Sequence, residues 1–380
     1  MKKRILVLGA GYAGIMAVNR LAKIDKHLDI TLINERDEFV ERIRNHEKLN
    51  PRPYKKYKIT DLIPNNVNFV EDKISNWNPD SSTIQLTNDK SEWKYDGLIY
   101  ALGSTKTNTM NPWLGIQTLT QTMETSQVLS EKQIQSVWIL GGGLTGIELA
   151  TELKESNKEI SVGIIEQGKF AHQFSKKGQT YIRNFFQKNH IQIIEGAKLI
   201  EHQNNEITFG NGTKVSYDLL IKTTGFLCSD LAKEAGIDTN EKNQIYVNEY
   251  LQIPKYQNVF VAGDAVYLPG SALRMGCVTA MPMGVYAAET VMKSLNGKKV
   301  YPFKFGFAGR CVSLGRKNGL IQMTNAYDKP KDLIFTGKLG AIIKELVCKY
   351  TMLSIKLEKS LPIRSYFWPK QDLMKIEKEI

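Results

Sequence analysis

The sequence predicts an α/β protein in which one strand–turn–helix–strand unit occurs twice. An apolar run, a glycine cluster and an amphipathic stretch follow one another at residues 4–21 and again at residues 137–150. Strand-like and helical segments also alternate along most of the chain, as in parallel sheets connected by helices. At 380 residues and 42% hydrophobic composition, the chain is long enough for two or three domains.

The first unit contains GAGYAG at residues 9–14, which matches the pattern GxGxxG. Gly9 permits a tight turn, Gly11 lets a pyrophosphate approach the backbone, and Gly14 lets the following helix pack closely on the strand. The next predicted strand ends at Glu35, where a carboxylate can accept hydrogen bonds from ribose hydroxyls. Together these features predict a dinucleotide-binding site.

The second unit repeats this arrangement with GGGLTG at residues 141–146. Its second strand ends at Glu166, which favours a free 2′-hydroxyl and repels a 2′-phosphate, so NADH is expected rather than NADPH. Lys169 lies close enough in sequence to weaken that preference.

Each unit is followed by similar segments, which indicates an internal duplication of architecture. Paired strands are expected after the first unit at residues 67–78 and 82–89, and after the second at residues 191–202 and 205–218. A strand ending in a small-residue turn follows each pair, and a further buried strand ends at Gly263 and Asp264.

In this order, the motifs resemble those of the FAD- and pyridine-nucleotide-dependent oxidoreductases that have two Rossmann-like dinucleotide-binding domains. The resemblance covers about residues 1–325, and the turn YALGS at residues 100–104 departs from the family pattern at Leu102. For FAD and the adjoining reaction site it implies the candidate binding residues Gly9, Gly11, Tyr12, Ala13, Gly14, Glu35, Arg36, Arg44, Ala101, Gly103, Gly263, Asp264, Ala280 and Met281. For NADH it implies Gly141, Gly143, Leu144, Thr145, Gly146, Glu166 and Gly225.

The resemblance also implies a domain order. The FAD domain is expected to be split into residues 1–111 and 240–328 by an inserted NADH domain at residues 112–239. Residues 329–380 then form a C-terminal extension.

Two segments bear on which members of the family the chain resembles. Disulfide reductases carry a cysteine pair after the first unit, but residues 39–50 contain no cysteine, so no dithiol relay is expected. Residues 277–284 resemble the segment that lies against flavin and quinone in type II NADH dehydrogenases, although Met281 and Val285 stand where those enzymes have glutamines. Met281 is a candidate catalytic residue, and the alternative is that these methionines fill the core.

Glu148 matches a glutamate that those dehydrogenases keep near the nicotinamide, and it is the second candidate catalytic residue. A first-turn acid that stabilises the helix is the alternative. Arg42, Arg44 and His46 are expected to line the flavin pocket, with His46 a candidate proton donor, or to form a solvated charge run. Cys277 is expected to be a small apolar filler rather than a thiolate.

The C-terminal extension combines apolar residues at helical spacing with interleaved lysines, including Lys344 and Lys349. Such a basic amphipathic helix suits an anionic membrane surface, and docking on the body or on a second subunit as a homodimer is the alternative. The net charge of +12 fits a membrane or an acidic partner. No nucleic-acid reader motif and no metal-ligand spacing are present in the sequence.

The resemblance therefore predicts an enzyme that oxidises NADH through FAD and passes electrons to a membrane quinone. Four dispersed cysteines suit the reducing cytosol, so the chain is expected in the cytoplasm or on the inner face of the cell membrane. Two alternatives remain open, namely a reductase of a small ferredoxin- or rubredoxin-type protein and a low-turnover flavin sensor.

Overall fold

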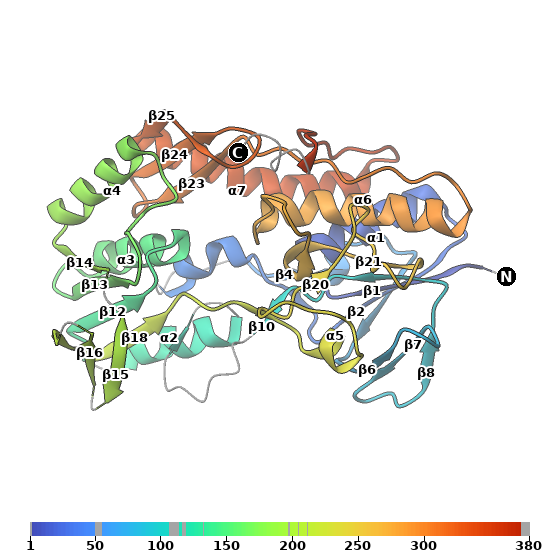
Figure 1. Cartoon of the computed structure of the whole chain (residues 1–380), viewed down its shortest axis with the longest axis horizontal. Helices are drawn as coiled ribbons and strands as arrows, with labels where there is room; N and C mark the ends of the chain where they lie inside the picture. The colour runs from blue at the N-terminus through green and yellow to red at the C-terminus, as the bar shows by residue number, and fades with distance from the viewer. Residues whose placement is uncertain are drawn as a thin grey trace.

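The computed structural model contains two five-stranded parallel sheets that lie side by side (Figure 1). It describes residues 2–49, 55–105, 114–115, 119–131, 133–196, 198–203, 205–210 and 212–373. The expected α/β class is confirmed. The expected start of the inserted domain at residue 112 lies outside the described residues.

The first sheet has the strand order β21–β9–β1–β2–β5, and all its neighbouring strands are parallel. Its strands are β1 (Arg4–Leu8), β2 (Asp29–Asn34), β5 (Val67–Glu71), β9 (Gly97–Tyr100) and β21 (Val259–Val261). Helices α1 (Tyr12–Ile24) and α6 (Cys277–Leu295) cover one face. They approach closely because a Cβ at Gly284 would lie 2.1 Å from the carbonyl oxygen of Ala13.

The second sheet has the order β11–β18–β12–β13–β14 and is also parallel throughout. Its strands are β11 (Leu114–Gly115), β12 (Ser136–Leu140), β13 (Ser161–Glu166), β14 (Ile191–Glu195) and β18 (Leu219–Lys222). Its helices are α2 (Leu119–Glu131), α3 (Leu144–Ser156) and α4 (Lys176–Lys188). The glycine-turn units β1–α1–β2 and β12–α3–β13 occupy the same positions in the two sheets, as the duplicated motifs predict.

Each sheet is followed by a three-stranded antiparallel meander. The meanders are β6 (Ile74–Asn78), β7 (Thr83–Leu86) and β8 (Glu92–Lys94), and β15 (Leu199–Gln203), β16 (Glu206–Phe209) and β17 (Lys214–Ser216). The expectation that residues 67–78 and 191–202 belong wholly to these pairs is wrong. The first half of each segment is a strand, β5 or β14, that forms the edge of a parallel sheet. The meander begins only after this edge strand is complete.

Short elements connect the two parts. β10 (Ser104–Thr105) pairs antiparallel with β19 (Leu227–Cys228), so two segments far apart in sequence lie together between the sheets. The remaining short elements are β3 (Glu38–Phe39), β4 (Tyr57–Lys58), β20 (Ile245–Tyr246), β22 (Val266–Tyr267), α5 (Leu231–Glu234) and the 3-10 helices η1 (Arg42–Leu49), η2 (Ile59–Asp61) and η3 (Gly263–Ala265).

The C-terminal part adds a third antiparallel sheet and the longest described helix. β23 (Gly309–Ser313), β24 (Gly319–Thr324) and β25 (Pro330–Thr336) form the sheet, and α7 (Gly337–Ser360) follows. β25 pairs antiparallel with β24, with Leu320 opposite Thr336 and Gln322 opposite Ile334. The chain then turns into α7, which contains the apolar residues at helical spacing that the sequence shows.

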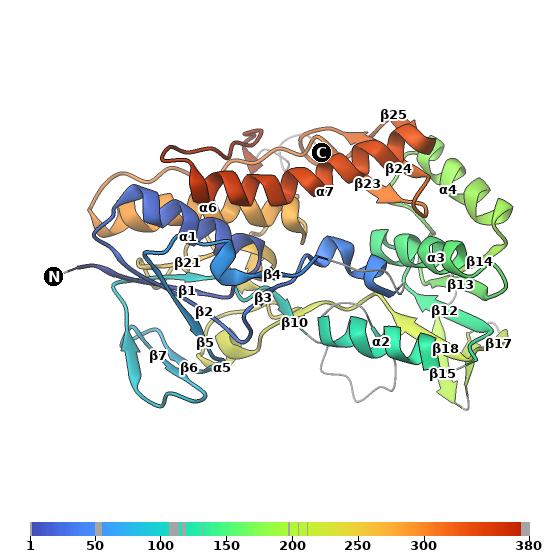
Figure 2. The ribbon, with the colours of Figure 1, turned by 180° about the vertical axis from the view of Figure 1, so that it is seen from behind.

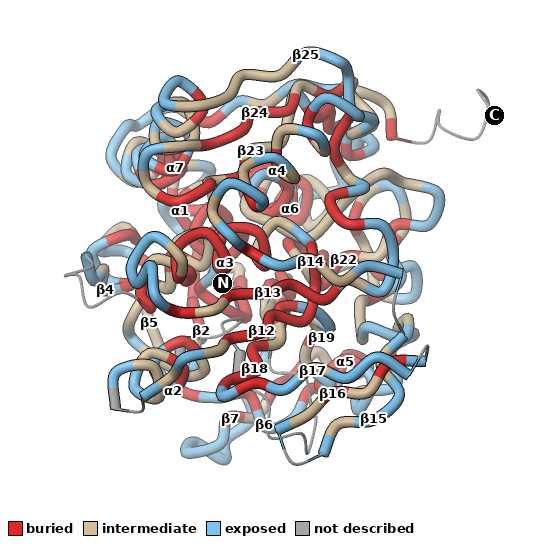
Figure 3. Tube along the Cα trace, turned by 90° about the vertical axis from the view of Figure 1, so that its left-hand side faces the viewer, coloured by how far each residue is buried: buried red, intermediate tan, exposed pale blue. Residues whose placement is uncertain are grey.

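Helix α7 runs across both parts of the molecule (Figure 2) and packs against α1 and the third sheet. Buried residues concentrate in the sheets and the facing helices, whereas outer loops and the outer side of α7 are exposed (Figure 3). In the part of the chain that the structure describes, no helix is both long and apolar enough to cross a membrane.

Candidate active site

The two glycine turns have matching geometry. Gly9 has φ +96° and Gly141 has φ +112°, a region that glycine adopts without steric cost. A Cβ at Gly9 would lie 2.5 Å from the carbonyl oxygen of Ala101, and one at Gly141 would lie 2.3 Å from Cγ2 of Thr224. Each first glycine therefore fits tightly against the strand that follows the meander.

The third glycine of each turn is equally constrained. A Cβ at Gly14 would lie 1.8 Å from the carbonyl oxygen of Gly9, and one at Gly146 would lie 1.9 Å from that of Gly141. No side chain fits at either position without moving the helix off its strand.

The middle glycines are open instead. A Cβ on Gly11 or Gly143 would meet nothing within 4 Å among the described residues. Gly11 is the N-cap of α1 and Gly143 is the N-cap of α3, and no described side chain hydrogen-bonds to the free N–H groups at either cap. Leu144 and Thr145 form the start of the first turn of α3. Backbone N–H groups and the positive end of the helix dipole are thus available to a phosphate at both turns.

The acids at the two strand ends differ in their contacts. Glu166 is fixed, because its carboxylate accepts hydrogen bonds from the backbone N–H of Gly142 at 2.7 Å and of Gly168 at 3.0 Å. Glu35 is more exposed and pairs with Arg36 at 2.6 Å. A residue that sequence reasoning missed, Asn34, accepts a hydrogen bond from the N–H of Ala10 at 2.9 Å and so holds the first glycine turn.

Asp264 joins several segments around the first turn. Its carboxylate accepts hydrogen bonds from Ser104 Oγ at 2.9 Å and from the N–H of Gly276 at 2.9 Å, and Arg42 Nη1 lies 3.6 Å away. Arg42 also donates to Ser104 Oγ at 2.8 Å, and its guanidinium stacks over the ring of Phe226. Ser104 closes the turn YALGS but was not a candidate site residue, because its contact with Asp264 depends on the pairing of β9 with β21.

A buried aromatic group lies at the start of α1. Tyr12 is 7% exposed, and its hydroxyl has no hydrogen-bond partner among the described residues. Burial raises the pKa of Tyr12 well above its ordinary value, so it stays protonated and able to donate. Protein atoms cover this hydroxyl, so Tyr12 packs beneath the turn, and its expected contact with a cofactor stays a prediction.

The small-residue turns also line this region. Gly103 and Gly225 have φ of +64° and +78°, and a Cβ on Gly103 would meet no described atom within 4 Å. Gly263 has φ +79°, and a Cβ there would lie 3.2 Å from that of Ala13.

The start of α6 is buried against α1. Ala280 is 6% exposed and Met281 is 3% exposed, and both belong to the core of the first sheet. Met283 Sδ accepts a hydrogen bond from the N–H of Gly263 at 3.3 Å. Burial raises the pKa of Cys277 to about 11, which agrees with a protonated filler. These contacts favour core filling for the methionines, so a catalytic role of Met281 stays a prediction.

The three basic residues of η1 are not a solvated charge run. Arg44 contacts three carboxylates, those of Glu41, Glu47 and Glu345, at 2.9–3.0 Å. The guanidinium of Arg44 is therefore paired with protein carboxylates, and the expected contact of Arg44 with a cofactor stays a prediction. Arg42 instead reaches Asp264, and His46 points toward α3.

Glu148 is the centre of a buried polar cluster. Its Oε1 accepts from Lys344 Nζ at 2.8 Å and from the N–H and Oγ of Ser313 at 3.1 and 3.2 Å. Its Oε2 lies 3.6 Å from His46 Nδ1. The sequence groups Lys344 with the interleaved lysines of a basic amphipathic helix, and α7 turns this lysine inward to the buried carboxylate.

The cluster shifts the pKa values of its members. Burial alone raises the pKa of Glu148, but Lys344 and His46 outweigh burial and hold it below its usual value. For Lys344 burial acts to lower the pKa, and Glu148 outweighs it, so the pKa is raised and the amine stays charged. Burial lowers the pKa of His46, which is therefore neutral near pH 7.

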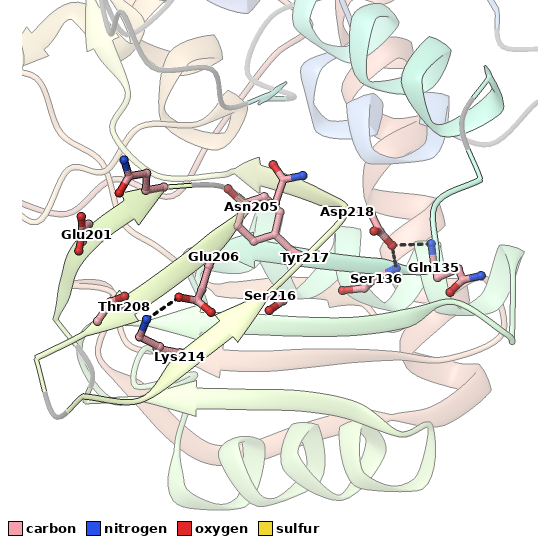
Figure 4. A pocket seen from close by; sticks show the side chains of 11 residues that line it. Gln135, Ser136, Glu201, Asn205, Glu206, Thr208, Lys214, Ser216, Tyr217 and Asp218 are labelled. Carbon is pink, nitrogen blue, oxygen red and sulfur yellow. Dashed lines mark hydrogen bonds and ion pairs between the residues drawn. The ribbon is translucent and has the colours of Figure 1, made fainter.

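A surface cavity of about 680 Å³ lies elsewhere, over the second meander and the start of β12 (Figure 4). Its lining is polar and includes the ion pair of Lys214 and Glu206 at 2.8 Å. No glycine-turn residue lines it, so we do not assign it to a nucleotide.

Comparisons with known proteins agree with this geometry. The family model described as pyridine nucleotide-disulphide oxidoreductase matches residues 3–289. A probable NADH dehydrogenase of Dictyostelium discoideum is 24% identical, covering 86% of this chain and 82% of that protein. The type II NADH:quinone oxidoreductase of Staphylococcus aureus is 23% identical, covering 91% and 94%.

The fold is shared with solved structures. The sulfide:quinone oxidoreductase of Aquifex aeolicus superposes with a TM-score of 0.80 at 18% identity, covering 95% of this chain and 96% of that chain. At this identity the likeness shows a common fold.

Proposed function

Because the chain belongs to the pyridine nucleotide-disulphide oxidoreductase family, we propose that it is a flavoenzyme that oxidises NADH and passes electrons to a membrane quinone. Membership makes the chain an oxidoreductase, and it implies a flavin and NAD(H). The proposal adds that the flavin is FAD and that no redox disulfide takes part.

The observation that carries this proposal is the pair of equivalent glycine turns. Gly11 and Gly143 are both open, and each stands at the N-terminus of a helix in its own parallel sheet. Two such cradles fit two dinucleotides, with residues 1–111 and 240–328 holding FAD and residues 112–239 holding NADH. A bound flavin would take the hydride of NADH and release electrons to the acceptor.

The chain's own residues then position the two nucleotides. Glu166 would accept the ribose hydroxyls of NADH, because two backbone N–H groups fix its carboxylate. Asp264, held by Ser104 and Gly276, would contact the FAD chain, while Glu148 would face the nicotinamide.

Two observations support a membrane quinone as the electron acceptor: the name of a relative and the exposed surface of α7. The Staphylococcus aureus relative carries the name type II NADH:quinone oxidoreductase. Helix α7 exposes an apolar stripe of Leu339, Ile342, Leu346, Tyr350 and Leu353, each at least 50% exposed. Such a stripe beside lysines fits the interface of an anionic membrane, where a lipid-soluble quinone is found.

A stopped-flow panel tests the proposal. The purified flavoprotein is reduced with NADH and then mixed with quinones, with ferredoxin or rubredoxin, or with oxygen. Rapid reoxidation by quinones supports the proposal, and a colourless protein that cannot be reconstituted with FAD refutes it.

The same panel separates the alternatives. Reoxidation by ferredoxin or rubredoxin alone would favour a carrier-protein reductase, which the net charge of +12 also suits. Rapid reduction by NADH without fast reoxidation by any acceptor would favour a redox sensor.

A further inference from the structure

A line of ionisable side chains leads from the surface to Glu148. Glu47 Oε1 lies 3.9 Å from His46 Nε2, and His46 Nδ1 lies 3.6 Å from Glu148 Oε2. Ser313 Oγ lies beside both gaps, 3.4 Å from His46 Nε2 and 3.2 Å from Glu148 Oε1.

The two ends of this line differ in exposure. The side chain of Glu47 is 22% exposed, whereas those of His46 and Glu148 are only 4% and 9% exposed. Glu47 is thus the outer group, and its carboxylate also pairs with Arg44 and Arg316, each at 3.0 Å. Glu148 is the inner end, where Lys344 holds its carboxylate.

Charged groups from each packed element face His46. Glu47 comes from η1, Glu148 from α3, Arg316 from the turn after β23, and Lys344 from α7. Burial is the largest influence and lowers the pKa of His46, so the ring is neutral near pH 7. A neutral imidazole has one donor and one acceptor nitrogen, so it can take a proton at one and release a proton from the other.

The proton balance of the proposed reaction requires such a path. NADH supplies a hydride, which is two electrons and one proton. A quinone that becomes a quinol takes two electrons and two protons, so the second proton comes from solvent.

We propose that Glu47 and His46 relay this proton from solvent to Glu148, and that Glu148 releases it to the quinone as the quinone takes up two electrons, so that the carboxylate is regenerated in each turnover. The inference rests on the proposed function, because only an acceptor that takes up protons needs the relay. The distances from Glu47 to His46 and from His46 to Glu148 are longer than a hydrogen bond. A bridging water, or a side-chain movement of about 1 Å, would allow proton transfer across each gap. His46 acts through Glu148 and is a positioning residue for proton delivery.

The test compares two acceptors in the full-length holoenzyme. Ferricyanide takes one electron and no proton, whereas a short-chain quinone takes up protons. The rate ratio of quinone to ferricyanide reduction is measured for wild type, H46Q, E47Q and E47D, with H172Q as the matched control at an exposed histidine. Circular dichroism and flavin content confirm folding.

We expect the ratio to fall about 100-fold in H46Q, as for loss of a proton-transfer group, and to stay at the wild-type value in H172Q. E47Q should lower the ratio, and E47D should restore part of it, because Asp keeps a titratable carboxylate. The quinone rate of wild type should decline with rising pH, and that decline should disappear in H46Q.

An unchanged ratio and pH profile in H46Q would overturn the relay and leave the proposed function standing. A wild-type enzyme that reduces ferricyanide but no quinone would overturn both. A structural defect at His46 would lower the two rates together, and that outcome also overturns the relay.

Discussion

At the scale of single residues, the glycines of the two turns have separate tasks. Gly14 and Gly146 have no room for a Cβ because a carbonyl oxygen lies within 2 Å of its position. Gly11 and Gly143 have room within the protein, and the proposed dinucleotides would require glycine at both positions. A glycine-to-alanine substitution, which adds one methyl group, can therefore distinguish a glycine needed for packing from one needed for ligand binding.

We expect G14A to lower the free energy of unfolding by at least about 2 kcal/mol, because the helix must move off its strand. G11A should leave the stability of the flavin-free protein nearly unchanged and weaken flavin retention, because the added methyl occupies the cradle. Urea unfolding and the flavin-to-protein absorbance ratio measure the two effects. Equal loss of stability in both variants would contradict this division.

Glu166 should set the choice of nicotinamide. E166Q keeps an oxygen for the N–H of Gly142 but removes the charge that repels a 2′-phosphate. The NADPH-to-NADH ratio of kcat/KM should rise about tenfold, as for a hydrogen bond to a charged group. E159Q, at an exposed carboxylate, is the control and should keep the wild-type ratio. No change in E166Q would show that the acid does not face the ribose.

His46 should make stability sensitive to mild acid. Its folded pKa lies below the unfolded value of 6.5, so its contribution is complete above that pH and is lost as the pH falls toward the folded pKa. Between about pH 7 and about pH 5, H46Q should lose less unfolding free energy than wild type. Glu148 also has a folded pKa below its ordinary value of 4.5, so its contribution to stability is lost as the pH falls below 4.5. Urea titrations at several pH values test this, and equal slopes would contradict it.

At the scale of elements, α7 has an unusual distribution of polarity. Its inner face carries Lys344, Thr351, Ser354 and Glu358, and Glu358 lies 3.3 Å from Lys23 on α1. Its outer face is the apolar stripe that begins at Leu339. The helix docks on the body partly through polar contacts and leaves its apolar stripe exposed.

We expect I342E/L346E to weaken binding to anionic vesicles about 100-fold, because two half-exposed aliphatic side chains would no longer enter the interface. I200E is the matched control, since Ile200 is 66% exposed on β15. Vesicle co-sedimentation measures binding, and light scattering reports dimers. Unchanged vesicle binding with loss of a dimer would assign the stripe to self-association.

At the scale of the whole molecule, several segments join two similar sheets, and η1 packs against α2 and α3 of the second part. The pair β10–β19 lies between the sheets, and α7 crosses both parts. Arg42 brings the segments together, since it contacts Ser104, Phe226 and the region of Asp264. A nucleotide bound in the first cradle would contact several of these segments at once.

Removing the flavin should therefore destabilise the entire fold. A ligand that binds only the folded state stabilises it by about 2.7 kcal/mol at a concentration of 100 Kd. We expect flavin-free protein to melt several degrees lower and added FAD to restore the Tm. Calorimetry with riboflavin as a control tests the need for the dinucleotide, and an identical Tm would contradict it.

The sequence alone determined the α/β class and the two glycine-turn units, because their residues act locally. Gly9, Gly11 and Gly14 are adjacent in the chain, and apolar runs with an acid at the end define β2 and β13 whatever surrounds them. The same local patterns indicated the amphipathic character of α7.

Only the tertiary structure decided which distant groups meet. Lys344 lies near the end of the chain, and no local pattern indicates that it faces Glu148 rather than solvent. Ser104 and Asp264 meet because β9 and β21, the strands that precede them, pair as parallel neighbours in the first sheet although they are far apart in the chain. The helical spacing of apolar residues shows that α7 has one apolar face and one polar face. Packing against α1 and the sheet β23–β24–β25 decides which of these faces is buried.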